Sequence, residues 1–268
     1  MTDVVIEKKG HVAIVKIEHM KAMNALSTDM YAQLEEAFDE LAKDLDDVYA
    51  VVLTGSSTVN KKGKTVNSFV AGADISEMAT KTCAEGKLFG NESNRVCWKI
   101  ENFKRPVIAA INGFCLGGGC ELAMSCDFRI CSDTAVFGQP ETGLGITPGF
   151  GGTQRLARLV GPGMAKQMIY TARNIKADEA YRIGLVNAVY PLSDLYAAAE
   201  KLAGQIAGNA PIAVRASKQA INDGLQVDID RAVVIEEKAF GSCFQSADQQ
   251  EGMGAFLEKR KEKHFQNK

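Results

Sequence analysis

Two glutamates stand out because they lie in an apolar, glycine-rich stretch that contains no histidine. Glu121 follows Gly117-Gly118-Gly119-Cys120, and Glu141, which ends Phe137-Gly138-Gln139-Pro140-Glu141, comes 20 residues later. A carboxylate among apolar neighbours is unfavourable unless it is hydrogen-bonded or needed for chemistry, so this pair predicts general acid/base catalysis. The alternative is two ordinary surface acids.

Two turns built from small residues accompany the glutamates. Gly117-Gly118-Gly119 follows an apolar stretch and opens a predicted helix, so its N–H groups lie at the positive end of the helix dipole with no side chains in the way. Ala71-Gly72-Ala73-Asp74 comes directly after Phe69-Val70 and can supply another N–H group. The turns can therefore bind an anion or a developing oxyanion, unless they are tight turns that merely need small residues.

Several common catalytic motifs are missing from the sequence. Gly63-Lys64-Thr65 ends like a phosphate-binding loop but lacks the first glycine of that motif, and the run from Gly143 to Gly149 misses the dinucleotide pattern by one residue. The sequence has no Gly-x-Ser-x-Gly elbow. The histidines, which would activate a serine or cysteine nucleophile, lie near the two ends, at His11, His19 and His264. With these motifs missing, the sequence favours acid/base catalysis by the two carboxylates.

Length and composition are those of an ordinary globular protein. The chain has 268 residues, of which 46% are apolar and 24% charged, and its formal net charge is −2. It can bury a sizeable core, and its charge gives no overall attraction to nucleic acid or to an anionic membrane. The charge therefore argues against nucleic acid as a partner, and since no apolar run approaches the roughly 20 residues that span a bilayer, we expect no membrane partner either.

The seven cysteines form an odd set in a sequence without a recognisable secretory leader. This favours reduced thiols and a cytoplasmic location. Cys115, Cys120, Cys126 and Cys131 lack the Cys-x-x-Cys spacing and the nearby histidines of a zinc site. We therefore expect small core thiols and no metal.

The first elements that position these residues alternate between strands and a helix. Strands over residues 4–7 and 11–17, a helix capped by Ser27 and a strand over residues 49–53 predict a β-β-α-β order. The segment 55–68 has no periodicity and is predicted to be an exposed loop. Its lysines, at positions 61, 62 and 64, are either solvated or in contact with ligand phosphates.

The same strand-and-helix unit recurs further along the chain. We expect strands over residues 107–111 and 128–130 with a helix over residues 118–125 between them. Thr153 can cap another helix that runs towards Gly161-Pro162.

The C-terminal third is predicted to be mainly helical. From Ala177 onward helical patterns are interrupted only by a strand-like stretch over residues 185–190. The tail over residues 248–265 is charged but carries three large apolar side chains, more than a free tail would need. We expect it to pack on the core or on a neighbouring subunit.

Five segments together resemble the enoyl-CoA hydratase/isomerase, or crotonase, superfamily, and within it the bacterial short-chain enoyl-CoA hydratases. The likeness covers nearly the whole chain and is most specific at Ser68–Ile75, Arg105–Gly113, Gly117–Asp127, Phe137–Glu141 and Pro148–Arg155. It implies an α/β fold, a crotonase-like spiral of ββα repeats in residues 1–198, followed by a helical C-terminal region in residues 199–268. The resemblance also implies that this region builds trimers, commonly paired into hexamers.

The resemblance also implies a reaction. The backbone N–H groups of Ala73 and Gly118 match an oxyanion hole for the thioester oxygen of an acyl-CoA. Glu121 and Glu141 match the acid/base glutamates, with Glu121 as the base towards water and Glu141 as the acid. The implied activity is reversible hydration of short-chain trans-2-enoyl-CoA, such as crotonyl-CoA, to 3-hydroxyacyl-CoA. No metal or redox cofactor is expected, because the thioester itself is the electron sink.

Binding of CoA is assigned by the same resemblance to residues outside the catalytic pair. The expected contacts are Lys21, Ala22, Ala71, Asp74, Ile75, Ser76, Gly149, Phe256 and Lys259. Lys21 and Ala22 match the loop that meets the nucleotide. Phe256 and Lys259 match tail residues that close the adenine pocket, often in the neighbouring subunit. A solvated charge at each lysine and core packing at Phe256 are the alternatives.

The sequence departs from the family pattern at the expected CoA entrance, and two rival functions stay open. Glu18–Met23 lacks the arginine and the proline that are usual there, Ser76 stands where many members have lysine, and the loop Ser56–Thr65 looks longer than usual. One rival is a Δ3,Δ2-enoyl-CoA isomerase, against which the retention of Glu121 argues. The other is a non-catalytic acyl-CoA-binding or RNA-binding relative, against which both glutamates and both turns argue.

Overall fold

The computed structural model describes residues 3–44, 46–60 and 62–268. Its strands are β1 (Val4–Lys9), β2 (Val12–Ile17), β3 (Ala50–Thr54), β4 (Ser56–Val59), β5 (Thr65–Val70), β6 (Val107–Ile111), β7 (Phe114–Leu116), β8 (Phe128–Ser132), β9 (Val136–Gly138), β10 (Asn174–Lys176) and β11 (Ala188–Tyr190). They form a six-stranded sheet in the order β1-β2-β3-β6-β8-β11 and a five-stranded sheet in the order β10-β9-β7-β5-β4.

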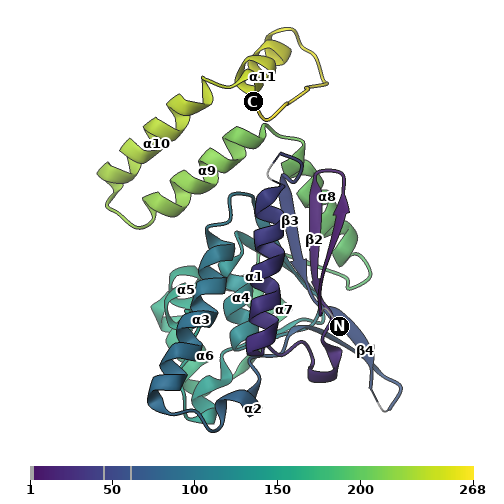
Figure 1. The fold of residues 1–268 in the computed structure, drawn as a ribbon, viewed down its shortest axis with the longest axis vertical. Helices are drawn as coiled ribbons and strands as arrows, with labels where there is room; N and C mark the ends of the chain where they lie inside the picture. The colour runs from purple at the N-terminus through teal and green to yellow at the C-terminus, as the bar shows by residue number, and fades with distance from the viewer. Residues whose placement is uncertain (1–2, 45, 61) are drawn as a thin grey trace.

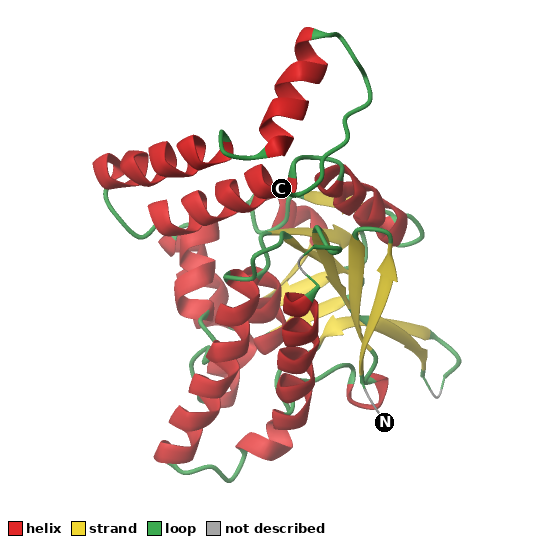
Figure 2. Ribbon diagram, turned by 45° about the horizontal axis from the view of Figure 1, so that its top comes forward, coloured by secondary structure: helices red, strands yellow, loops and turns green. Residues whose placement is uncertain are grey.

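Helices follow the strands along the chain. The α-helices are α1 (Thr28–Lys43), α2 (Ile75–Met78), α3 (Cys83–Glu101), α4 (Gly118–Ser125), α5 (Gly152–Val160), α6 (Pro162–Thr171), α7 (Ala177–Arg182), α8 (Leu195–Ala207), α9 (Pro211–Gly224), α10 (Ile229–Cys243) and α11 (Ala247–Leu257). Two 3₁₀ helices, η1 (Met20–Ala22) and η2 (Pro140–Leu144), lie in connecting segments. Figures 1 and 2 show α1 and α3 beside the strands, while α9, α10 and α11 extend away from them.

Successive turns of the chain add a strand to each sheet. The strands β3, β6 and β8 enter the larger sheet, and β5, β7 and β9, which come between or after them, enter the smaller one. Neighbours within each of these series pair in parallel. Parallel neighbours require crossover connections, which here carry the helices, so the chain winds as a spiral. The expected α/β fold with ββα units and a helical C-terminal region is confirmed.

Both faces of the larger sheet are covered. In β3, Val51 and Leu53 belong to the main core beneath the helices, whereas Ala50 and Val52 belong to a second cluster on the opposite face. That second cluster is completed by α8, through side chains such as Ala199. A sheet that is buried on both faces explains why its strands read as continuous apolar runs. The predicted boundary at residue 198 falls within α8.

The prediction of an exposed loop over residues 55–68 was wrong. These residues form the antiparallel hairpin β4–β5, in which Ser56 pairs with Ser68. Polar hydrogen bonds anchor it, because the buried Asn24 amide donates to the carbonyls of Ser68 at 2.9 Å and of Phe69 at 3.1 Å. Serine, threonine and asparagine on both faces hide the alternation by which strands are recognised. Of the hairpin lysines, 62 and 64 are exposed, and Lys61 lies outside the described residues.

The helix that Thr153 was expected to cap starts slightly earlier. It begins at Gly152, and its N-cap is Gly151, which has a left-handed φ of 94°. Glycine adopts that conformation without steric cost, so no side-chain cap is needed.

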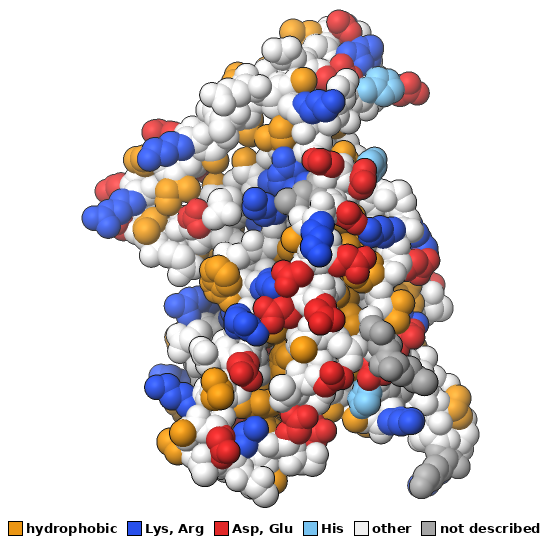
Figure 3. Space-filling view, viewed as in Figure 1, with side chains coloured by type: hydrophobic (Ala, Val, Ile, Leu, Met, Phe, Trp, Pro, Cys, Tyr) orange, Lys and Arg blue, Asp and Glu red, His pale blue; other side chains and the backbone are white. Residues whose placement is uncertain are grey.

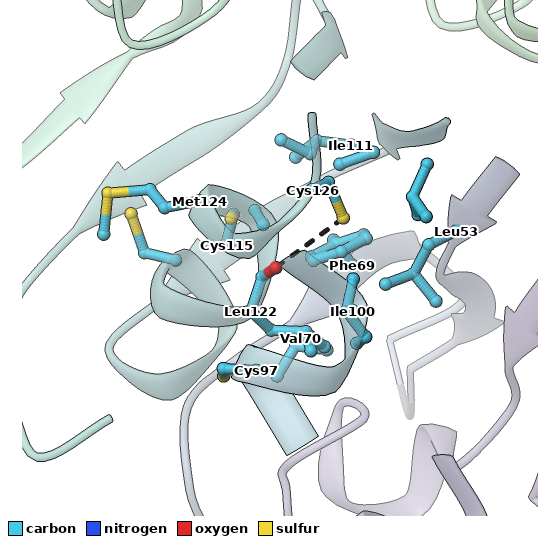
Figure 4. Close-up of a cluster of buried hydrophobic side chains, with 14 of the residues drawn as sticks. Leu53, Phe69, Val70, Cys97, Ile100, Ile111, Cys115, Leu122, Met124 and Cys126 are labelled. Atoms are coloured by element: carbon cyan, nitrogen blue, oxygen red, sulfur yellow. Dashed lines mark hydrogen bonds between the residues drawn. The ribbon is translucent and has the colours of Figure 1, made fainter. Parts of the chain in front are cut away.

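Helix α4 is buried along its whole length and lies against β5. A Cβ atom added at Gly119 would sit 2.2 Å from the carbonyl oxygen of Val70, so only glycine permits this approach. Figure 4 shows Leu122 of α4 packed with Phe69 and Val70. The four thiols expected in the core, Cys115, Cys120, Cys126 and Cys131, are buried and free.

One ion pair anchors the helical arm α9–α11 to the sheets. Lys218 Nζ donates to Asp127 Oδ2 at 2.8 Å and to the carbonyl oxygen of Arg105 at 3.1 Å. The tail beyond α11 folds back onto its own chain, because Asp248 accepts hydrogen bonds from the backbone N–H groups of Gln266 and Asn267. Asn222, near the end of α9, also donates to the carbonyl oxygen of Glu101 at 3.1 Å, so the arm is tied to the core through α9.

Candidate active site

Helix α4 places Glu121 one turn after its first residue, in a buried position. Its side chain is 1% exposed, and its Oε1 accepts hydrogen bonds from the backbone N–H groups of Phe150 at 2.8 Å and Gly152 at 2.6 Å. Both donors belong to the turn that opens α5. Two short bonds from the backbone hold this carboxylate in one orientation.

Glu141 approaches from the 3₁₀ helix η2 and is 8% exposed. Neither of its carboxylate oxygens has a hydrogen-bond partner among the described residues. A buried carboxylate without partners is strongly unfavourable unless water or a ligand completes its hydrogen bonds. Both oxygens are therefore available to accept hydrogen bonds from water or from a ligand.

The glycine turn before α4 brings three parts of the chain together. Gly117 has a φ of 49°, and a Cβ atom built on it would lie 2.9 Å from Glu141 Oε1 and 3.8 Å from the Cα atom of Gly72. Any side chain at this position would strike the Glu141 carboxylate. The first turn of α4, Glu141 and the small-residue turn at 71–74 are thus neighbours.

Two backbone amides of these turns are free to bind a ligand. The structure shows no acceptor among the described residues for the N–H groups of Ala73 and Gly118. Leu26 bonds to the residues on either side of Ala73. Its N–H group donates to the carbonyl of Gly72, and its carbonyl accepts from the N–H group of Asp74. Gly118 is the first residue of α4, where an N–H group has no intrahelical acceptor.

Gln139 is a site residue that the sequence analysis did not single out. Its fully buried side chain donates from Nε2 to the carbonyl oxygen of Gly117 at 3.1 Å, and its Oε1 has no partner among the described residues. A Cβ atom at Gly152 would lie 2.4 Å from Gln139 Oε1 and 2.7 Å from Glu121 Oε1. The Gln139 side chain therefore connects the turn before α4 with the turn before α5. Its only sequence signal was its place within the segment that ends at Glu141.

Both glutamates hold protons more tightly than an exposed glutamate does. Burial raises the pKa of Glu121 to about 7, helped by the charge of Glu141 and opposed by the N–H groups of Gly152 and Phe150. Burial likewise raises the pKa of Glu141 to about 7. The two groups titrate as a pair, and near neutral pH one can be a carboxylate while the other is a carboxylic acid.

The residues predicted to bind CoA around the turn at 71–74 lie close together. The backbone N–H group of Ala71 donates to the carbonyl of Met23, which follows the η1 residues Lys21 and Ala22. Asp74 caps α2 and accepts hydrogen bonds from Ser76 N at 2.8 Å and Oγ at 2.6 Å, which lower the pKa of Asp74.

Four of the remaining predicted contacts are exposed. Ile75 and Gly149 lie near the turns, and the Gly149 carbonyl accepts a hydrogen bond from Asn94 at 2.9 Å. Phe256 is 79% exposed on α11, and Lys259 follows it with a φ of 57°. Figure 1 places α11 at the opposite end of the molecule from α2. Within one chain, the structure does not bring the tail residues to the other predicted contacts.

Neither a metal cluster nor a membrane segment is found in residues 3–44, 46–60 and 62–268. This part of the chain contains no group of three or more His, Cys, Asp or Glu side chains arranged to hold a metal ion. It also has no helix that is both long and apolar enough to span a bilayer.

Comparison with known proteins identifies the family. The family model described as enoyl-CoA hydratase/isomerase matches residues 7–268. The chain belongs to this family. Among similar proteins, the short-chain-enoyl-CoA hydratase of Clostridium acetobutylicum is 55% identical over 268 residues, covering 100% of this chain and 99% of the relative. The crotonyl-CoA hydratase of Syntrophomonas wolfei is 53% identical over 259 residues, covering 97% of this chain and 96% of the relative.

Solved structures of enoyl-CoA hydratases have the same fold. The crystal structure of the enoyl-CoA hydratase from Bacillus anthracis superimposes with a TM-score of 0.92 at 37% identity, covering 99% of this chain and 100% of that one. An enoyl-CoA hydratase structure from Geobacillus kaustophilus gives a TM-score of 0.90, also at 37% identity, with coverages of 99% and 98%. The crotonase-like fold expected from the sequence is thereby confirmed.

Proposed function

We propose that this member of the enoyl-CoA hydratase/isomerase family reversibly hydrates short-chain trans-2-enoyl-CoA to 3-hydroxyacyl-CoA, with crotonyl-CoA as a substrate. The observation that carries the proposal is the pair of buried glutamates, Glu121 and Glu141, whose pKa values lie at about 7 beside a turn with free amides. The relatives at 55% and 53% identity, named short-chain-enoyl-CoA and crotonyl-CoA hydratase, support it.

In this proposal the thioester oxygen accepts hydrogen bonds from the N–H groups of Ala73 and Gly118. Adding water to an α,β-unsaturated thioester builds negative charge on that oxygen. Fixed donors in a dry pocket stabilise such charge, and removing one typically costs roughly 3 to 4 kcal/mol of transition-state stabilisation. Gly118 adds the positive end of the α4 dipole.

In this proposal the two glutamates carry out the proton transfers that add one water molecule to the substrate. Glu121 acts as the base: its Oε1 is held by two backbone N–H groups, which leaves Oε2 to take a proton from the water. The water oxygen forms a bond to the β carbon as the double-bond electrons move towards the thioester. Glu141, in its acid form, then delivers a proton to the α carbon. The reverse sequence dehydrates the 3-hydroxyacyl-CoA, and no metal or redox cofactor takes part.

Substitution of each glutamate tests the assignment. Glu121→Gln and Glu141→Gln should each lower the rate of crotonyl-CoA hydration by about 10² to 10⁴-fold, measured as loss of the ultraviolet absorbance of the conjugated thioester. Glu85→Gln, which changes an exposed capping glutamate at the start of α3, is the matched control and should keep the normal rate. Near-normal turnover in both the Glu121 and the Glu141 variant would contradict the proposed roles of these residues as base and acid.

The same assay separates the rival functions. An isomerase given an unconjugated 3-enoyl-CoA makes the absorbance appear, whereas a hydratase given a conjugated trans-2-enoyl-CoA makes it disappear. A non-catalytic relative binds acetoacetyl-CoA but leaves crotonyl-CoA unchanged.

The partners proposed are the acyl-CoA substrate and further copies of this chain, in a trimer or hexamer located in the cytoplasm. Large apolar side chains on the arm support assembly, because exposed apolar surface of this kind usually meets a partner. The most exposed of them are Ile221, Leu225, Ile229, Phe240, Phe256 and Leu257. Figure 3 shows apolar side chains interspersed with charged ones on the arm. In such an assembly Phe256 and Lys259 complete the CoA site of a neighbouring copy.

A further inference from the structure

A side chain of α5 holds the turn that fixes Glu121. Arg155 Nη1 donates to the carbonyl oxygen of Phe150 at 2.9 Å. The N–H groups of Phe150 and Gly152, which donate to Glu121 Oε1 at 2.8 and 2.6 Å, belong to the peptide groups directly before and after the one that carries this carbonyl. Arg155 therefore restrains the peptide group that joins the two donors.

The carbonyls of those two neighbouring peptide groups are bonded as well. Asn94 Nδ2 of α3 donates to the carbonyl oxygen of Gly149 at 2.9 Å. The carbonyl oxygen of Gly151 accepts the backbone N–H group of Arg155 at 2.8 Å, at the start of α5. Because a peptide group is planar, a bond at its carbonyl also fixes the direction of its N–H group. The two donors to Glu121 are thus held in place from behind, and Arg155 supplies the central bond.

Arg155 is itself anchored to α3. Its Nη2 donates at 2.8 Å to Oε2 of Glu101, the last residue of that helix. A planar guanidinium offers separate N–H groups to the carboxylate and to the carbonyl in a fixed geometry, which a lysine ammonium does not. A Cβ atom at Gly151 would lie 2.1 Å from Arg155 Nη1, so the guanidinium packs directly on the turn.

The groups that interact electrostatically with Glu121 include Glu141 of η2, Arg155 of α5, Tyr31 of α1 and Cys97 of α3. Burial raises the pKa of Tyr31 well above its usual value and that of Cys97 to about 12, so both are neutral near pH 7. Burial and the charge of Glu141 raise the pKa of Glu121, and the charge of Arg155 opposes them. The guanidinium therefore favours the carboxylate form that a base requires.

We propose that Arg155 is a positioning residue for the hydration reaction, which holds the Glu121 carboxylate towards the attacking water by fixing the turn at residues 149–152. The inference rests on the proposed hydration of enoyl-CoA. Arg155 acts on the reaction through the turn and through Glu121, and Glu101 keeps its guanidinium in place.

The experiment measures kcat and KM for crotonyl-CoA hydration as a function of pH. Arg155→Met keeps the apolar stem and removes the guanidinium. We expect kcat to fall by about 10 to 100-fold with little change in KM, because a displaced catalytic group slows the chemical step more than it weakens binding. The acid limb of the kcat profile should move up by about one pH unit, since Glu121 must be ionised to act as the base and loses a neighbouring cation.

Arg155→Lys is the conservative variant. It keeps the charge but cannot bond to Glu101 and to the Phe150 carbonyl in the same geometry. We expect its kcat and its acid limb to lie between those of the wild type and those of Arg155→Met. Arg158→Met is the matched control, because Arg158 is an exposed arginine of the same helix that donates to Gln154 one turn earlier. It should keep the wild-type kcat and pH profile.

A purely structural role for Arg155 would lower the unfolding temperature and leave kcat per folded enzyme and the acid limb unchanged. That result in Arg155→Met, or equal changes in Arg158→Met, would overturn the proposal. If the methionine variant does not fold, the kcat and acid limb of Arg155→Lys decide. Failure of the proposed function is a separate outcome, because the wild-type enzyme would then not hydrate crotonyl-CoA at all.

Discussion

Replacing the buried Glu121 by glutamine should stabilise this protein, and only above a particular pH. Burial raises the pKa of Glu121 from 4.5 to about 7, so the folded state binds the proton more tightly than the unfolded state does. For an acid with a raised pKa, stability is highest below the unfolded pKa and falls as the pH rises through the folded pKa. Glutamine is always neutral and escapes this loss, while its oxygen can still accept the hydrogen bonds from Phe150 and Gly152.

The size of the effect follows from the shift. A change from 4.5 to about 7 is a difference of roughly 2.5 pKa units, and one unit corresponds to 1.36 kcal/mol. At pH 8 we therefore expect Glu121→Gln to raise the free energy of unfolding by up to about 3 kcal/mol. Near pH 4.5 the difference should vanish. Glu141→Gln should act in the same direction, but the two gains will not add, because the charge of Glu141 is itself one of the causes that raise the pKa of Glu121.

Urea unfolding of the wild type and of both variants at pH 4.5, 6 and 8, at one fixed protein concentration, measures these differences. Glu251→Gln is the control of opposite sign, because the hydrogen bonds from Arg260 lower the pKa of this half-buried glutamate to about 2. Its loss should reduce stability at pH 8. The reasoning is refuted if Glu121→Gln is less stable than the wild type at pH 8, since the two backbone hydrogen bonds would then outweigh the desolvation of the charge.

Three further predictions concern packing and assembly. Gly119→Ala should destabilise the protein by about 3 kcal/mol or more in thermal unfolding, because its Cβ atom would strike Val70, whereas Gly86→Ala, which meets no atom, should be neutral or slightly stabilising. Lys218→Met should cost about 1 kcal/mol in urea unfolding, because the partly exposed Asp127 would lose its ion-pair partner. Adding Asp127→Asn to that variant should recover part of the loss, and no recovery would contradict the pairing. Analytical ultracentrifugation should show a trimer or hexamer, and a monomer at micromolar concentration would contradict the proposed assembly.

Local patterns in the sequence were sufficient for the elements whose signal lies in neighbouring residues. The apolar run of β6 predicted a buried strand, and the apolar spacing after Ser27 predicted α1 with its cap. The hairpin β4–β5 could not be predicted in this way, because its polar strands are held by Asn24 and by the neighbouring strand β7. Such partners come together only when the chain folds.

The sequence by itself determined which groups are available for chemistry: two glutamates, two small-residue turns and no central histidine. Only the tertiary structure decided that Glu121 is fixed by the turn before α5, that Glu141 is buried without a partner among the described residues, and that Gln139 lies beside Glu121. The physical reason is that burial and hydrogen bonding depend on residues distant in the chain. A glutamate has an ordinary pKa in the unfolded chain, and the pKa of about 7 arises when packed helices and strands exclude water from it.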